Sequence, residues 1–104
     1  MKAKDCLKSY NPETLDVVRG WIEDNLACAD YIYPARENTT NYLTGVINDQ
    51  VCCDLSIRAV HALLKEAGFV HTGDPTGDTG QYNIALASLH RVFPKAGFDT
   101  IPLT

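Results

Sequence analysis

The segment from Asp54 to Val70 constrains the fold most, because it carries a complete set of helix signals. Asp54 or Ser56 can cap its start, and Gly68 suits the left-handed residue that follows a helix end. Apolar residues at helical spacing define a buried side, formed by Ile57, Val60, Leu64, Ala67 and Gly68. Because Arg58, Ala62 and Lys65 share the opposite side, we expect a helix with one exposed face.

Two further helices are predicted before this one. Asn11 is a good N-cap and Pro12 fits the first helical position, so the first helix should run from about Pro12 to Ala29. Its apolar stripe is continuous along the helix and consists of Leu15, Val18, Ile22, Leu26 and Ala29. The second helix should run from about Thr40 to Gln50, although Gly45 weakens it by about 1 kcal/mol relative to alanine.

The segment after these helices indicates a turn between two short strands. Residues 73–80 contain three glycines and one proline, which is typical of a turn or loop. Residues 69–72 and 81–84 flank it as candidate strands of a β-hairpin, and a last short helix should cover about residues 85–93. The expected fold class is therefore mainly α with a small β-hairpin, in one α+β domain that covers residues 1–104.

Composition excludes several classes of protein. A chain of 104 residues with 45% hydrophobic and 21% charged residues fits one globular core. The net charge of −4 gives no bulk basicity for nucleic acid, and no apolar run approaches the roughly 18 residues of a membrane span. The N-terminus lacks the apolar stretch of a secretory signal, so we expect a cytoplasmic protein with reduced thiols at Cys6, Cys28, Cys52 and Cys53.

The order of three helices and a glycine-tipped hairpin resembles the winged helix-turn-helix family over about residues 40–86. The run from Leu55 to Val70 resembles its recognition helix, and residues 73–84 resemble its wing. The resemblance implies a transcriptional regulator that binds double-stranded DNA, with Ser56, Arg58, Ala62 and Lys65 entering the major groove. Against this function, the wing tip carries Asp74 and Asp78, and few cations are present to neutralise phosphates.

Part of the chain also resembles small proteins of phages and mobile elements, through Tyr42-Leu43, residues 55–69 and residues 82–84. That resemblance implies an anti-CRISPR-like inhibitor that docks on a host protein or protein–nucleic-acid complex. The small size and acidic charge also favour a non-enzymatic, protein-binding function. The expected partner-binding residues are Trp21, Tyr31 and Tyr33 for apolar contact and Asp74 and Asp78 for electrostatic contact. Core packing is the alternative for Trp21, and a homodimer is the alternative use of an exposed aromatic patch.

Candidate chemical sites are incomplete. A zinc site from Cys52, Cys53, His61 and His71 would lack a second spaced pair of ligands. Cys53 before a helix start could act as a nucleophile, but nothing in the sequence fixes a base beside it. The acidic loop from Asp74 lacks the glycine and glutamate of a calcium-binding loop. We therefore expect no catalytic residue, no metal and no cofactor.

Overall fold

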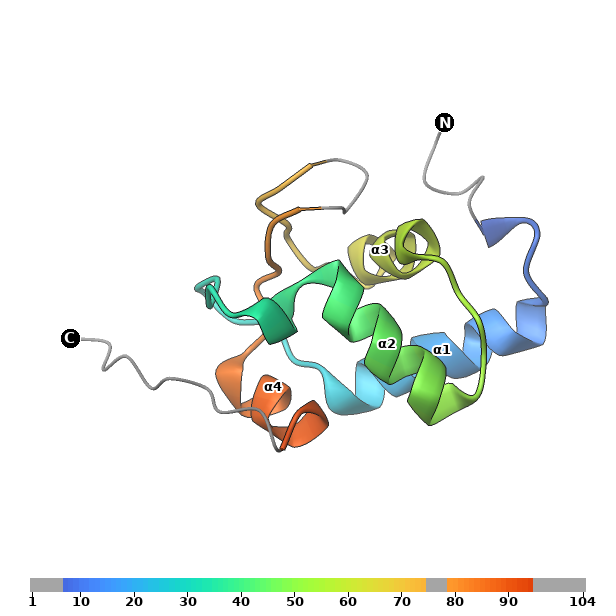
Figure 1. The fold of residues 1–104 in the computed structure, drawn as a ribbon, viewed down its shortest axis with the longest axis horizontal. Helices are drawn as coiled ribbons and strands as arrows, with labels where there is room; N and C mark the ends of the chain where they lie inside the picture. Colours follow the sequence, from blue (N-terminus) through green and yellow to red (C-terminus); the bar gives the residue numbers. More distant parts are fainter. Residues whose placement is uncertain (1–6, 75–78, 95–104) are drawn as a thin grey trace.

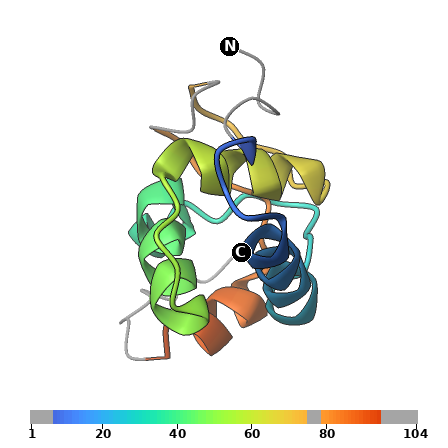
Figure 2. The same ribbon diagram turned by 90° about the vertical axis from the view of Figure 1, so that its right-hand side faces the viewer.

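The structure, a computed structural model, describes residues 7–74 and 79–94. This part of the chain is mainly helical, and its elements are α1 (Pro12–Asn25), the short 3-10 helix η2 (Arg36–Asn38), α2 (Thr40–Val51), α3 (Ile57–Glu66) and α4 (Leu86–Val92). Helix α3 lies across one side of the molecule and α4 lies on the opposite side, with α1 and α2 between them (Figures 1 and 2). The helical fold class is confirmed.

The first helix begins where the sequence predicts and ends four residues early. The Asn11 side chain accepts the N–H of Glu13 at 2.8 Å, and Pro12 is the first helical residue. After Asn25 the chain is extended, because residues 27–29 bind a different segment. Ala29 N–H donates to the Asn83 carbonyl and Ala85 N–H donates to the Ala27 carbonyl, both at 2.8 Å. Long-range backbone bonds therefore replace the last helical turn.

A short connection links α2 to α3. Cys52 ends α2 in the left-handed conformation, with φ 58° and ψ 50°. The Asn48 side chain then holds the connection, because it accepts the Leu55 N–H at 2.8 Å and donates to the Leu55 carbonyl at 3.0 Å. Ser56 caps α3 by accepting the Ala59 N–H at 3.1 Å, and Gly68 follows the helix with φ 102°, so both predicted ends are confirmed.

The expected β-hairpin is not seen among the described residues. His71 and Tyr82 form one isolated bridge, and Cys28 forms another with Ile84. The reason is that the segment around Tyr82 divides its backbone hydrogen bonds among several neighbours. Asn83 N–H donates to the Val70 carbonyl at 3.1 Å, as in a hairpin, but the Asn83 carbonyl accepts the Ala29 N–H, and the Val70 N–H donates to the Asn83 side chain at 2.7 Å instead. A continuous two-strand ladder therefore does not form.

The core lies where the predicted apolar stripes meet, except that Ala67 and Gly68, expected on the buried side of α3, are exposed. Helix α3 runs through this core. Six consecutive residues of α3, Ala59–Leu64, are buried, so the middle of this helix is covered on every side. Ala62 is only 5% exposed, which corrects the expectation that it lies on a free face. Tyr33 is also a core residue, at 7% exposure, which corrects its assignment to a surface patch. No helix within the described ranges is long and apolar enough to cross a membrane.

Candidate functional site

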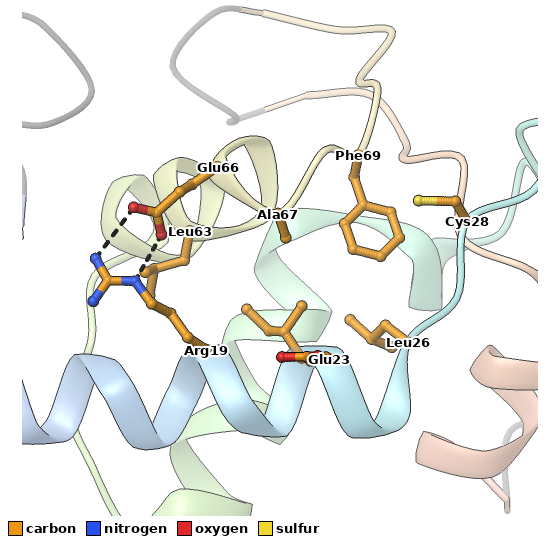
Figure 3. Close-up of a pocket in the computed structure, with 9 residues that line it drawn as sticks. Arg19, Glu23, Leu26, Cys28, Leu63, Glu66, Ala67 and Phe69 are labelled. Atoms are coloured by element: carbon orange, nitrogen blue, oxygen red, sulfur yellow. Dashed lines mark hydrogen bonds and ion pairs between the residues drawn. The ribbon is translucent and has the colours of Figure 1, made fainter.

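A groove of about 600 Å³ lies between α1 and α3. Buried apolar side chains form its floor: Ile22, Leu26, Leu63 and Phe69. More exposed residues line its rim: Arg19, Glu23, Cys28, Glu66 and Ala67. Figure 3 shows Arg19 and Glu66 at one end of the groove and Phe69 with Cys28 at the other. The groove thus offers an apolar surface between charged edges.

An ion pair joins the two helices across one end of the groove. Arg19 donates from Nε to one Glu66 oxygen at 2.7 Å and from Nη2 to the other at 3.2 Å (Figure 3). Its Nη1 donates to Asp16 at 3.0 Å, and the bond to Glu66 is the main cause that raises the pKa of Arg19. The side chains of Arg19 and Glu66 are 39% and 51% exposed. An exposed pair of this kind contributes at most about 1 kcal/mol, so breaking it would cost the fold little.

The outer surface of α1 is acidic. The helix carries four exposed carboxylates, Glu13, Asp16, Glu23 and Asp24, and a single cation, Arg19. Arg19 is held by Asp16 and Glu66, whereas Glu23 makes no ion pair within residues 7–74 and 79–94. The rim of the groove therefore has an excess of negative charge, and Glu23 is available to bind an incoming cation.

A second cluster of polar side chains is buried around Tyr82. The Tyr82 hydroxyl contacts Thr40 Oγ1 at 2.7 Å and His61 Nδ1 at 2.5 Å, and the ring of His71 packs beside both aromatic rings. Burial raises the pKa of Tyr82 to about 12 and is the main cause that lowers the pKa of His71. Because Tyr82 is fully buried, this cluster ties segments of the chain together rather than offering a hydroxyl to a substrate.

The structure does not bring the predicted partner-binding residues together in the groove. Trp21 is half-buried against the core, and Tyr31 is 42% exposed while its hydroxyl accepts the Leu86 N–H at 3.1 Å. Asp74 is exposed on the connection between α3 and α4, and Asp78 lies outside the described residues. Tyr33 is buried in the core. The groove is lined by other residues.

The predicted DNA-binding residues lie on α3 and at its start. Ser56, Arg58 and Lys65 are exposed, whereas Ala62 is buried. Sequence reasoning missed the groove because its ion pair joins residues 47 positions apart. The local signal that the sequence does contain is the row of carboxylates on α1, Glu13, Asp16, Glu23 and Asp24.

No group of three or more histidine, cysteine or acidic side chains that could hold a metal lies among the described residues. Cys28, Cys52 and Cys53 are free thiols, and burial is the main cause that raises the pKa of Cys53. A raised thiol pKa lowers the fraction of reactive thiolate. Comparison with protein-family models, with curated proteins and with solved structures gave no match.

Proposed function

We propose that the chain is a non-enzymatic protein-binding module that docks a basic, amphipathic segment of a partner protein into the groove between α1 and α3. The observation that carries this proposal is the combination of an apolar floor with two carboxylates, Glu23 and Glu66, at the rim. A partner segment with apolar side chains on one face and Lys or Arg at its edge complements both features.

The floor and the rim have different energetic roles. Burying one Leu-sized side chain against Leu26, Leu63 and Phe69 would contribute about 1.5–3 kcal/mol. A basic side chain at the rim can pair with Glu23, or with Glu66 in place of Arg19. Exposed charges of this kind mainly set orientation and association rate. The affinity should therefore come mostly from the apolar anchor and survive moderate salt.

The partner that we propose is a nucleic-acid-binding protein of a host defence complex. The resemblance to phage and mobile-element proteins supports this class, which includes anti-CRISPR-like inhibitors. Proteins that hold nucleic acid present Lys and Arg toward the phosphates. Such a basic surface has the charge that Glu23 and Glu66 at the groove rim complement.

A winged-helix DNA-binding function is less well supported. A recognition helix needs one free face along its length to enter the major groove. In α3 the middle is buried on every side, and the exposed candidate cations are Arg58 near its start and Lys65 near its end. We therefore treat binding to double-stranded DNA as the competing outcome of the test.

The test is a selection from a library of displayed peptides against the purified full chain, followed by titration with the enriched peptide. Glu23→Arg reverses the charge at the rim, and Ala67→Arg places a bulky side chain at an exposed groove position. Asp24→Arg is the matched control, because it makes the same charge change on α1 at a residue that does not line the groove. A pool of double-stranded DNA at low and moderate salt is the second probe.

Enrichment of peptides with a basic residue beside apolar residues is expected. Their binding should weaken at least tenfold in Ala67→Arg, about fivefold in Glu23→Arg and no more than about twofold in Asp24→Arg, a fivefold loss being about 1 kcal/mol. No enrichment, or equal binding by all the variants, would contradict the proposal. Salt-sensitive DNA binding that is lost in an Arg58→Ala/Lys65→Ala variant would replace it with the regulator function.

A further inference from the structure

Three aromatic rings pack together at the connection between α3 and α4. The ring centroids of His71 and Tyr82 are 4.5 Å apart, and those of His61 and His71 are 4.8 Å apart. His61 belongs to α3, while His71 and Tyr82 come from the two chain segments that leave α3 and return to α4. The Tyr82 hydroxyl also contacts Thr40 at the start of α2, so the rings fix both segments on the helices.

The surroundings of His71 suit a neutral ring. Its Nδ1 accepts the Gly73 N–H at 3.3 Å, which places the ring proton on Nε2. Nε2 is buried and makes no hydrogen bond of acceptable geometry within the described residues. A positive charge here would lie against His61 and feel the cation of Lys65.

Some groups around His71 favour its protonated form, but they offset the unfavourable effects of burial and Lys65 only in part. The carboxylate of Asp74 and the backbone of Gly80 favour the protonated ring, whereas burial and Lys65 disfavour it. Burial is the largest of these causes, so the pKa of His71 lies below its usual value. The Thr40 and Tyr82 hydroxyls carry no charge at neutral pH. Protonation therefore costs more in the packed state than in water.

We propose that His71, packed between His61 and Tyr82, is an acid-sensitive anchor that holds the segments joining α3 to α4 on the rest of the fold. When these segments separate, His71 enters water and takes up a proton with an ordinary pKa near 6.5. Acid therefore favours the separated state. If the packed ring stays neutral, lowering the pH from 7.5 to 5.5 should increase the separated population about tenfold.

Amide hydrogen exchange followed by NMR on the full chain tests this anchor. Thr72 N–H binds the Gln81 carbonyl and Asn83 N–H binds the Val70 carbonyl, so both amides report on the two segments. Their protection factors should fall about tenfold between pH 7.5 and 5.5, and that of Ile22 in α1 should fall less. Equal protection of Thr72 and Asn83 at the two pH values would overturn the proposal.

Two variants separate protonation of His71 from general acid sensitivity. His71→Phe keeps an aromatic ring beside Tyr82 but cannot take up a proton, so the fall in protection should be much smaller than tenfold. A fall of the original size in this variant would assign the pH dependence to another group and overturn the proposal. His90→Phe, at an exposed histidine of α4, is the matched control and should keep the full pH dependence. Should His71→Phe fail to fold, NMR titration of the ring in the unmodified chain decides: a pKa below 6.5 supports the anchor, and one at or above 6.5 refutes it.

Discussion

A fully buried amide, Asn38, ties together two distant parts of the chain. Its Nδ2 donates to the Tyr33 carbonyl at 2.8 Å and to the Tyr82 carbonyl at 2.6 Å. The first bond shapes the connection before α2, and the second holds the segment that leads into α4. Asn38→Asp keeps the size of the side chain but replaces this double donor with an oxygen, so it tests the role of the amide directly.

The expected loss is large because two carbonyls lose their donor at once. Each buried polar group left without a partner costs about 1–3 kcal/mol. Loss of the donor to both carbonyls should therefore lower the free energy of unfolding by about 2–6 kcal/mol at pH 7. Burial and the facing carbonyls should raise the pKa of the new carboxyl above the ordinary 3.9 or so. The folded state then binds the proton more tightly than the unfolded state. The difference from the unmodified chain should therefore shrink as the pH falls from 7 toward 4.

Urea unfolding followed by circular dichroism at pH 7 and pH 5 measures both effects. Asn41→Asp is the control, because it makes the same change on an exposed residue in the first turn of α2, where a negative charge is favourable. We expect the free energy of unfolding of this control to lie within about 0.5 kcal/mol of that of the unmodified chain. A similarly small effect of Asn38→Asp, or a large effect that does not change with pH, would refute the reasoning.

Three further predictions concern single residues. Cys52→Gly should stabilise the fold by about 1 kcal/mol in urea, because glycine removes the steric cost of the left-handed conformation, whereas Cys52→Val should destabilise it. Ser56→Ala should cost about 1 kcal/mol through loss of the α3 cap, and Ser56→Thr should restore much of it. Because the folded pKa of Tyr82 is about 12 against an ordinary 10, stability should fall by up to about 2.7 kcal/mol between pH 10 and 12. This loss of stability at alkaline pH should be absent in Tyr82→Phe. If it persists in that variant, its assignment to ionisation of Tyr82 is wrong.

Local signals predicted the helices well. The Asn11 and Ser56 caps act within two or three residues, so the sequence alone contains the whole interaction. The apolar stripe of α1 was also predicted, since Leu15, Val18 and Ile22 are all buried. These features depend on helical periodicity, which a sequence displays directly.

Contacts between residues far apart in the sequence could not be predicted. Residues 81–84 have the alternation of a strand, but the Asn83 carbonyl accepts the N–H of Ala29 instead of that of Val70, so no continuous hairpin ladder forms there. Tyr33, next to a proline, was expected at the surface, yet its carbonyl accepts the Asn38 amide and its side chain is buried in the core. The groove depends on Arg19 reaching Glu66 on another helix. None of these partners can be identified from local periodicity.

The middle of α3 packs against other parts of the fold on every side. This explains why we propose a binding site beside this helix rather than on it. Leu63, Glu66 and Ala67 face the groove shared with α1, whereas His61, about half a turn away from Leu63, packs against His71 and Tyr82. Val60 and Leu64 are buried in the core on the remaining side. A helix enclosed in this way cannot present its middle to DNA or to a helix of a partner protein. What it offers is one wall of the groove, with Glu66 at the edge where we propose that a partner's cation binds.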